Sequence, residues 1–561
     1  MVQHRIKACA AYLRHLWLLA AMTAASVLVT NVAAGTAGRD RTSGYVNVGS
    51  GSDNVTFVFY GATGDLCRRK LYPTVFQLFL ENKLPEAFFI VGMSNQDMSL
   101  ADFRKMHRPQ LEKVWSSSKQ SVDPARGNLL KQFEGRMSYT SGSIDDDNVL
   151  RPFCHKISKM ELLRAPNSRW GRLLYLALPP HIFAVAAAGF KRNCSAHESW
   201  TRVVVEKPFG RDSESSELLA EQLRSVLREE EIYRIDHYLG KEMLLALPPL
   251  RFTNTFLEPL LNRNYVKEIV ISFNEDIGIS GRGEFFDAYG IIRDVMQNHL
   301  LQLLTLVVME RPATLSDEDI RDEKVKVLKQ IDPISLAETV VGQYAKSEDG
   351  SVASYLETEG VPSHSRTPTY AAVCLHLRSP RWEGVPIFME AGKGMGKKTV
   401  YVRIKFAGVP GFRGSTYDYR GDSLILEIQP HPSVRFEINA KAPGAGLTLE
   451  RDSLKMDVTT DGVRIPDAYE NLLSNVLRGD KSQFVRTDEL RESWRIFTPM
   501  LHQLEEQQIQ PRLYAFGSPG PSGAMHELRS VVTASLNGAN TKSKAGSRFS
   551  QRFYASTGKH S

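Results

Sequence analysis

The sequence has few cysteines, and they show no metal-binding or disulfide pattern. Five cysteines occur in 561 residues, their number is odd, and none of them forms a CxxC pair. Domains held together by disulfides and structural zinc modules carry closely spaced sets of cysteines, so we expect neither a disulfide framework nor a zinc site. Scattered single cysteines also favour a reducing compartment.

Charge of one sign is not concentrated anywhere in the chain. Lys and Arg number 70 against 63 Asp and Glu, and the two signs are interspersed. A nucleic-acid groove would need a basic stripe with aromatic platforms, so we expect small anionic ligands and no nucleic-acid partner. Hydrophobic content of 42% and charged content of 24% are typical of a globular chain. At roughly 150 residues per domain, the length predicts two to four domains.

One long apolar run occurs, and it lies near the start of the sequence. Arg5 and Arg14 precede an apolar stretch over residues 16–32, and no acidic residue appears before Asp40. This layout suits a secretory signal or signal anchor, an organellar transit peptide, or a translation start further along the chain. We therefore treat residues 1–45 as a leader and expect cytoplasmic folded domains without stable membrane association. The alternative is an organelle or the secretory pathway, if the leader is functional.

A β-α-β unit follows the leader. Residues 54–60, NVTFVFY, form a β-branched and aromatic run typical of a buried strand, and a helix over 71–80 and a strand over 88–92 come next. Between strand and helix lies the sequence Gly61-Ala62-Thr63-Gly64-Asp65-Leu66. Glycine at this point lets the backbone approach a pyrophosphate, and the helix N-terminus adds a positive dipole end. Without its context, the same motif would indicate only a tight turn.

Two more apolar runs extend the predicted sheet. Residues 173–178 and 203–205 are almost continuously hydrophobic and alternate with helical segments, which predicts a parallel sheet covered on both faces. Ligands of such sheets bind beyond the carboxyl ends of the strands, so Gly61, Pro179 and Lys207 should meet at one crevice.

The stretch 234–242, RIDHYLGKE, gathers several potential anion ligands. As the start of a helix it would place His237, Tyr238 and Lys241 on one face, which suits a phosphate near the helix N-terminus. Asp236 would point elsewhere and could orient a histidine from another element. An ordinary solvated helix start with a charge pair is the alternative.

The pattern changes after residue 249. Residues 267–273, 371–377, 400–406, 423–428 and 434–438 alternate apolar and polar positions, which predicts a largely antiparallel sheet in a second, α+β domain. A long apolar helix is predicted over 285–310, and it carries Asp294 and His299. A buried, hydrogen-bonded structural histidine is the alternative to a functional one.

Six segments in unbroken order resemble the glucose-6-phosphate dehydrogenase family. They are GATGDL (61–66), EKPFGRD (206–212), RIDHYLGKE (234–242), FFDAYGIIRDVMQNHLLQ (285–302), RDEKVKVL (321–328) and TDELRESWRIFTP (487–499). The resemblance implies an NADP-binding Rossmann-like domain over 46–234 and a larger domain over 235–517, built on a mostly antiparallel sheet with helices. A flexible tail over 518–561 and assembly into homodimers or homotetramers are expected as well.

The resemblance also implies a reaction and a set of site residues. The family oxidises C1 of glucose 6-phosphate to 6-phosphogluconolactone and makes NADPH, the entry step of the pentose phosphate pathway. His299 would be the general base and Asp236 its partner, and no metal is needed. The substrate would be held by Lys207, His237, Tyr238, Lys241, Glu275, Asp294, Lys393 and Lys398. The coenzyme would lie along Gly61, Ala62, Thr63, Gly64, Asp65, Leu66, Lys70, Asn95 and Lys207.

Two positions depart from the family pattern. Asn95 stands where the family usually has an arginine that binds the 2′-phosphate of NADP; Arg68, Arg69 or Lys70 could compensate. Glu390 replaces an arginine of the second, structural NADP site of animal enzymes, and a carboxylate opposite a phosphate is unfavourable. Two alternative functions remain: a lumenal hexose-6-phosphate dehydrogenase, and a catalytically silent NADP-binding regulator.

Overall fold

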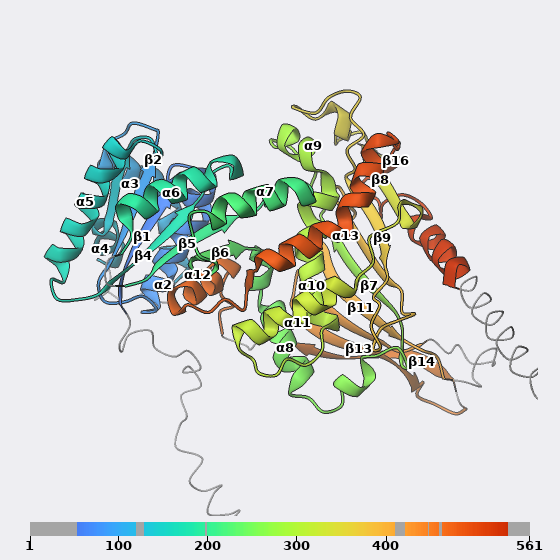
Figure 1. The fold of residues 1–561 in the computed structure, drawn as a ribbon. Coiled ribbons are helices and arrows are strands. Elements are labelled where there is room, and N and C mark those ends of the chain that lie inside the picture. The colour runs from blue at the N-terminus through green and yellow to red at the C-terminus, as the bar shows by residue number, and fades with distance from the viewer. Residues whose placement is uncertain are drawn as a thin grey trace, which may run out of the picture. The chain divides into compact units, whose positions relative to one another are not determined.

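The computed structural model describes residues 53–118, 128–196, 199–409, 421–446, 448–458 and 463–536. The predicted leader and the last part of the predicted tail, 537–561, lie outside the described residues. Two β-sheets organise the described part of the chain (Figure 1).

The first sheet contains seven strands within the described residues, in the order β15-β6-β5-β4-β1-β2-β3. The strands are β1 (Asn54–Tyr60), β2 (Phe88–Ser94), β3 (Met137–Ser141), β4 (Trp170–Leu176), β5 (Thr201–Glu206), β6 (Ile232–Ile235) and β15 (Phe484–Val485). All of them run parallel except β15, which pairs antiparallel with β6. The predicted parallel sheet is confirmed.

Helices cover both faces of this sheet (Figure 1). Phe57 and Phe59 of β1 belong to one hydrophobic cluster, whereas Val58 and Tyr60 belong to another, so successive side chains of one strand are buried on opposite faces. The helices of this part are α2 (Tyr72–Leu80), α3 (Leu100–Ser117), α4 (Leu129–Gly135), α5 (Asp147–Arg164), α6 (Phe183–Cys194) and α7 (Ser213–Arg224). Asp212 caps α7, as predicted.

The carboxyl ends of β1, β4 and β5 lie side by side. Tyr60 pairs with Leu176, and Leu176 pairs with Val205, so the segments that follow these strands meet at one edge. Gly61 leaves β1 with a φ of 76°, and a Cβ there would lie 2.2 Å from the carbonyl oxygen of Ala177. Only glycine fits this close turn.

The second sheet contains nine strands within the described residues, in the order β14-β13-β12-β11-β7-β10-β9-β8-β16. They are β7 (Val266–Asn274), β8 (Thr339–Ser347), β9 (Tyr370–Leu375), β10 (Ile387–Gly392), β11 (Thr399–Phe406), β12 (Ser423–Gln429), β13 (Ser433–Lys441), β14 (Leu449–Asp457) and β16 (Arg512–Phe516). The pairs β7–β10 and β8–β16 are parallel and the others antiparallel. The predicted, largely antiparallel sheet is confirmed.

The single long helix predicted over 285–310 is wrong in detail. The segment divides into α9 (Gly283–Ile291), the π-helix η8 (Ile292–Leu300) and α10 (Leu301–Val308). Gly290 breaks the helix with φ 66° and ψ 172° and packs against Thr367 and Pro368. The π-helical stretch changes the angular spacing of its side chains, and Asp294 and His299 both lie in it.

Two of the sequence motifs meet in the core of the second part. This part also contains α8 (Glu242–Phe252), α11 (Asp317–Gln330), α12 (Ala468–Arg478) and α13 (Thr487–Glu506). Lys324 of α11 and Glu489 of α13 form an ion pair at 2.8 Å, and both side chains are fully buried. These motif residues therefore connect the two helices and lie outside the candidate site described below.

The chain returns to the first sheet near its end, which the predicted domain boundaries did not include. β15 extends that sheet, and Leu472, Leu473 and Val476 of α12 lie in a hydrophobic cluster with β1 and β2. The predicted flexible tail also starts too early. Residues 524–536 are helical, and their apolar positions Ala524, Leu528 and Val532 recur every four residues and are buried.

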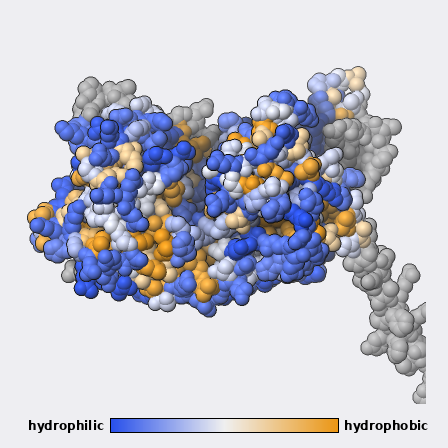
Figure 2. Space-filling model, turned by 90° about the horizontal axis from the view of Figure 1, so that it is seen from above, coloured by the Kyte–Doolittle hydropathy of each residue, from blue (hydrophilic) through white to orange (hydrophobic). Residues whose placement is uncertain are grey.

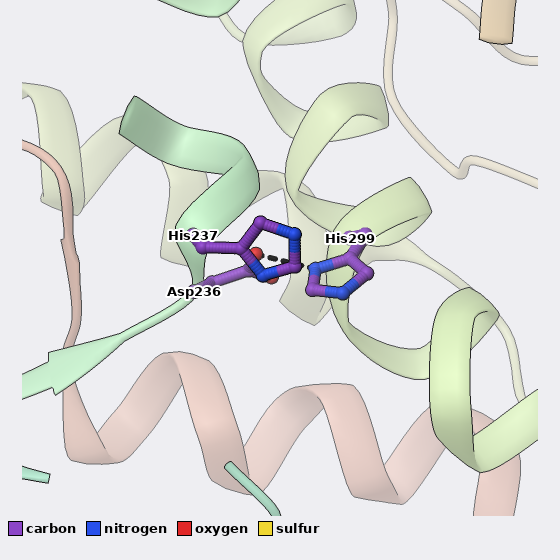
Figure 3. Close-up of side chains that lie close together, drawn as sticks. All are labelled: Asp236, His237 and His299. Carbon is purple, nitrogen blue, oxygen red and sulfur yellow. Dashed lines mark hydrogen bonds and ion pairs between the residues drawn. The ribbon is translucent and has the colours of Figure 1, made fainter. Parts of the chain in front are cut away.

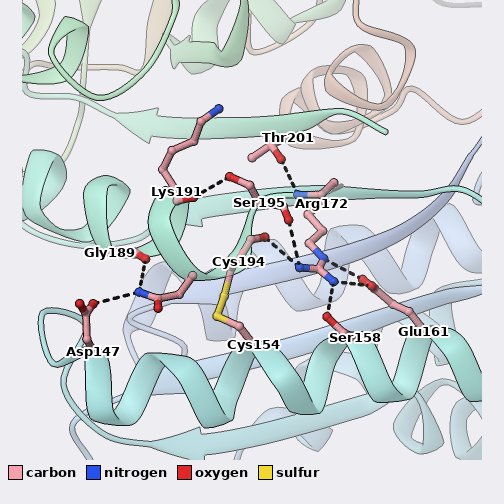
Figure 4. The surroundings of a disulfide bond; sticks show 12 residues. Asp147, Cys154, Ser158, Glu161, Arg172, Gly189, Lys191, Cys194, Ser195 and Thr201 are labelled. Carbon is pink, nitrogen blue, oxygen red and sulfur yellow. Dashed lines mark hydrogen bonds and ion pairs between the residues drawn. A yellow bond between two sulfur atoms is a disulfide. The ribbon is translucent and has the colours of Figure 1, made fainter. Parts of the chain in front are cut away.

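A disulfide joins Cys154 of α5 to Cys194 of α6, which contradicts the expectation of unpaired cysteines (Figure 4). The two helices pack together and bring the Cα atoms to 5.1 Å, a distance that suits a disulfide. Buried Arg172 lies beside the bond and donates hydrogen bonds to Glu161 and to the Cys194 carbonyl. Because the packing of the two helices brings these cysteines together, their separation of 40 residues in the sequence gave no indication of a disulfide. The cysteine content no longer argues for a reducing compartment.

The surface drawn in Figure 2 is mostly hydrophilic, with scattered hydrophobic residues. None of the helices in the described part of the chain combines the length and the apolar character that crossing a bilayer requires.

The disulfide generates a prediction about stability. Reducing it should lower the stability of the folded chain by about 3–4 kcal/mol, since an unfolded chain without the cross-link regains the entropy of a closed loop of this size. Thermal unfolding with and without dithiothreitol measures the effect. A Cys154→Ser/Cys194→Ser double variant is the control, and its unfolding temperature should not respond to reductant. The disulfide would be contradicted if the native chain unfolded at the same temperature with and without dithiothreitol and if Cys154 and Cys194 could both be alkylated in denaturant without reductant.

Candidate active site

The stretch 234–242 connects the two parts of the fold and does not form the regular helix start that its spacing predicted. β6 ends at Ile235, Asp236 is extended, and a short 3₁₀ helix η6 (His237–Gly240) precedes Lys241, which is the N-cap of α8. A Cβ on Gly240 would lie 2.4 Å from the carbonyl oxygen of Ala468, so α12 packs directly on this turn. The tertiary contact and the turn, rather than helical periodicity, set the directions of the side chains.

Asp236 contacts His299, which comes from η8 (Figure 3). Oδ1 of Asp236 lies 2.5 Å from Nδ1 of His299, and both side chains are buried. The backbone N–H of Tyr238 also donates to Oδ1, at 2.9 Å. Within the described residues, Nε2 of His299 forms no hydrogen bond, so this nitrogen can receive a proton from a bound molecule.

The pair is arranged electrostatically as a carboxylate and a neutral imidazole. Burial raises the pKa of Asp236, but the charge and hydrogen bond of His299 outweigh it and bring the pKa to about 2. Burial lowers the pKa of His299 below its usual 6.5, and the attraction of Asp236 offsets only part of that effect. Near neutral pH the carboxylate is therefore charged and the imidazole is free to act as a base.

His237 lies next to this pair (Figure 3). Its ring meets the ring of His299 edge to face, with 4.7 Å between centroids. One carboxylate oxygen of Asp236 and one ring nitrogen each of His237 and His299 lie within 4.8 Å of one another. Such a trio resembles a set of metal ligands, but Nδ1 of His299 and Oδ1 of Asp236 are already hydrogen-bonded to each other. We therefore interpret the trio as a proton-transfer centre.

Positive charge gathers beyond His237. Burial lowers the pKa of Lys241 to about 8, and repulsion from Lys398 and Lys70 contributes to this. The Lys241 ammonium lies 4.5 Å from the centroid of the Tyr238 ring, and the hydroxyl of Tyr238 donates to Gln429 at 2.8 Å. A cavity of about 470 Å³ opens here, with His237, Lys241 and Lys70 in its wall. The cluster can bind an anion.

Lysines and carboxylates alternate on the other side of the pair. Lys207 Nζ donates to the carbonyl of Asp294 at 2.6 Å and lies 3.3 Å from its carboxylate. Lys393 Nζ lies 3.4 Å from the same carboxylate and 2.5 Å from Glu275. Burial raises the pKa of Asp294, but both lysines outweigh it and bring the pKa far below the usual range. These four side chains offer donors and acceptors of the kind that bind sugar hydroxyls.

The predicted coenzyme residues lie at the edge where the strands of the first sheet end. Ala62 is buried in the turn, Thr63 Oγ1 donates to Ser94 at 3.2 Å, and Gly64 is exposed. Asp65 binds Arg68 and Arg69, each at 2.9 Å, and Lys70 binds Asp467 at 3.0 Å. Leu66 packs against the adjoining hydrophobic cluster. Asn95 follows β2 directly and is exposed.

Three residues that sequence reasoning missed, Glu206, Tyr469 and Gln429, also touch the site. Tyr469 of α12 stacks parallel to His237 and donates to Glu206 at 3.2 Å. Tyr175 donates to the same carboxylate at 2.5 Å, and burial raises the pKa of Glu206. Gln429 is the third residue. Glu206 precedes Lys207 in a quoted motif and could have been found from it, whereas Tyr469 and Gln429 arrive through long-range packing.

Comparison with known proteins supports one family over most of the chain. Residues 58–245 match "Glucose-6-phosphate dehydrogenase, NAD binding domain", and residues 248–532 match "Glucose-6-phosphate dehydrogenase, C-terminal domain". A solved structure titled "Glucose-6-phosphate dehydrogenase in complex with its substrate glucose-6-phosphate" superposes with a TM-score of 0.79 at 40% identity, covering 86% of this chain and 98% of that one.

Individual relatives agree with these matches. Glucose-6-phosphate 1-dehydrogenase of Caenorhabditis elegans is 43% identical, over 83% of this chain and 89% of its own. The Dictyostelium discoideum protein of the same name is 40% identical, over 84% and 93% respectively. The chloroplastic enzyme of Solanum tuberosum is 42% identical, over 85% and 82%. The chain belongs to the glucose-6-phosphate dehydrogenase family.

Proposed function

We propose that this chain oxidises D-glucose 6-phosphate at C1 to 6-phospho-D-glucono-1,5-lactone, with NADP as the hydride acceptor. The observation that carries this proposal is the buried Asp236–His299 pair at 2.5 Å, which lies beside a cluster of cations. The names of the relatives and the substrate complex of the solved neighbour support the same reaction. In this role the chain would begin the oxidative pentose phosphate pathway and supply NADPH.

The turn after β1 fits a dinucleotide. Gly61 has a positive φ, Gly64 is exposed, and a helix begins directly after the turn at the carboxyl edge of a parallel sheet. These features allow a pyrophosphate to approach backbone N–H groups and a helix N-terminus. Ala62, Thr63, Asp65, Leu66, Lys70, Asn95 and Lys207 would surround the coenzyme along with the two glycines. A bound nicotinamide supplies the hydride acceptor.

His299 acts as the general base. As C1 is oxidised, its hydroxyl group loses a proton, and Nε2 of His299 accepts it. The ionised Asp236 holds the imidazole through Nδ1 and stabilises the imidazolium that forms. Burial keeps His299 neutral before the reaction, so the base is available at pH 7.

The remaining side chains position the substrate. His237, Tyr238 and Lys241, with Lys398 nearby, bind the phosphate, because several donors of different reach hold a dianion well. Lys207, Glu275, Asp294 and Lys393 bind the sugar hydroxyls and already form a connected network. This arrangement fixes C1 next to the base.

The two alternatives are less well supported. A silent NADP-binding regulator would not need a buried base with an ionised partner, and the pair is intact. A lumenal hexose-6-phosphate dehydrogenase was suggested by the leader alone. Assembly into homodimers or homotetramers through the second sheet belongs to the same proposal.

Removing the base should abolish turnover. We expect His299→Asn to lower kcat by about 100- to 10,000-fold, the usual contribution of a general base, and to leave the affinity for glucose 6-phosphate almost unchanged. The control is His376→Asn, which removes a histidine that also pairs with a carboxylate, Glu338 at 2.8 Å, but lies away from the site. Formation of reduced coenzyme measures kcat, and isothermal titration measures affinity. Comparable turnover in both variants would eliminate His299 as the base.

The phosphate cluster predicts an alkaline limit to substrate binding. The pKa of Lys241 is lowered from 10.5 to about 8, so the ammonium is present below pH 8 and is lost as the pH rises through that value. KM for glucose 6-phosphate should therefore rise above pH 8, whereas Lys241→Arg should keep KM flat to higher pH. Lys241→Thr should raise KM about ten- to hundredfold at pH 7, the cost of one hydrogen bond to a charged group. Steady-state kinetics across pH test this; an unchanged KM in Lys241→Thr would remove Lys241 from the phosphate site.

Coenzyme choice is tested at Asn95. We expect kcat/KM to be higher for NADP than for NAD, and Asn95→Arg to raise this ratio about tenfold, because a guanidinium binds a phosphate monoester strongly. Asn264→Arg introduces the same charge at an exposed position of the second part and should leave the ratio unchanged. A clear preference of the unmodified chain for NAD would refute the coenzyme assignment.

A further inference from the structure

A second cavity lies apart from the residues of the proposed reaction. It has a volume of about 500 Å³, and its walls come from α9 and η8, from residues 362–368 and from the C-terminal half of α13. Neither Asp294 nor His299 lines it, although both belong to η8. Its size is typical of cavities that hold small molecules.

Polar and apolar residues both line this second cavity. Its apolar part includes Ile292, Val341, Leu501, Leu504 and Ile509. Tyr289 adds an aromatic ring, which stacks on Phe285 with 5.0 Å between centroids. Apolar surface of this kind favours the hydrocarbon or aromatic body of a ligand over a small, fully hydrated ion.

Arginines surround the apolar wall. Arg293 donates to Glu505 at 2.7 Å, and Arg211 lies 3.7 Å from the same carboxylate, so two guanidinium groups share one acid. Arg366 is exposed and donates to the neutral amide oxygen of Gln508 at 2.6 Å. Among the ion pairs of the described residues, Arg366 takes part in none. The cavity therefore carries an excess of positive charge on its rim.

The other acid of the cavity, Asp287, offsets only part of this excess, because three arginines line the cavity with two carboxylates. Asp287 Oδ1 accepts hydrogen bonds from Tyr355, at 2.6 Å, and from Ser365. The carboxylate is directed to hydroxyl donors of the surrounding elements and is not paired with an arginine. A bound anion can thus interact with Arg366 and Arg211 without breaking an ion pair of Arg366.

We propose that the second cavity binds an amphipathic organic anion, with an apolar body and one carboxylate, sulfonate or phosphate head. The body lies on Tyr289, Leu504 and Ile509, which line the cavity and are partly exposed, and the head lies at Arg366 and Arg211. The site is separate from the phosphate cluster at Lys241, because the two cavities share no lining residue.

The position of the second cavity links it to the reaction centre. Arg293 and Asp294 are neighbours in η8, yet Arg293 lines this cavity while Asp294 binds Lys207 and Lys393. Arg293 also donates to the carbonyl of Arg211, four residues after Lys207. An occupant therefore contacts the segments that carry the proposed base and one of the proposed sugar ligands.

Fluorescence titration of the full chain with 8-anilinonaphthalene-1-sulfonate tests the proposal, because this probe has an aromatic body and a sulfonate head. Glucose 6-phosphate is present at saturation to fill the reaction site. We expect one probe molecule per chain, a Kd raised about tenfold or more by Arg366→Glu through charge repulsion, and loss of binding in Ala288→Trp, which fills the cavity from an exposed wall position.

The matched control is Arg263→Glu, the same charge reversal at an exposed position outside the cavity, and it should leave the Kd unchanged. Catalytic turnover of each variant shows that it is folded. Absence of probe binding, a lower affinity for the probe with glucose 6-phosphate than without it, or equal affinity in the native chain, Arg366→Glu and Ala288→Trp would overturn the proposal.

Discussion

The contact between Asp236 and His299 joins the two parts of the described chain. Asp236 follows the last parallel strand of the first sheet, and His299 lies on the π-helix of the second part. Both groups are buried, and neither would be stable there alone, because an ionised carboxylate in the interior needs a donor and an imidazole needs a partner. The hydrogen bond therefore fixes where the strand end and the helix meet.

Several backbone features keep this contact in place. The kink at Gly290 and the π-helix that follows it direct His299 toward the strand end, and the close approach of α12 to Gly240 holds the turn after Asp236. Further away, the fully buried ion pair of Lys324 and Glu489 ties α11 to α13. Removing one partner of such a pair leaves an uncompensated buried charge, so the contact between these helices depends on both side chains.

Sequence patterns predicted the structural features that depend on residues close together in the chain. The strands β1, β5, β7 and β11 and the cap Asp212 could be located from hydrophobic patterns, and the candidate site residues were named from the family resemblance. The break at Gly290, the return of α12 to the first sheet and the disulfide of Cys154 and Cys194 could not. Each of these is set by packing between segments far apart in the chain, which local periodicity does not report.

The charges of the candidate site also agree with the proposed substrate, because the two groups of lysines are paired differently. In the proposed sugar site, Lys207 and Lys393 are each paired with Asp294, so these lysines are already close to neutralised and suit uncharged hydroxyl groups. At the other end Lys241 forms no ion pair among the described residues, and burial together with neighbouring lysines makes its charge costly. A dianion relieves that cost, whereas a neutral sugar does not. Lys207 and Lys241 both lie close enough to His237 to affect its charge, yet only Lys207 has an ion-pair partner among the described residues.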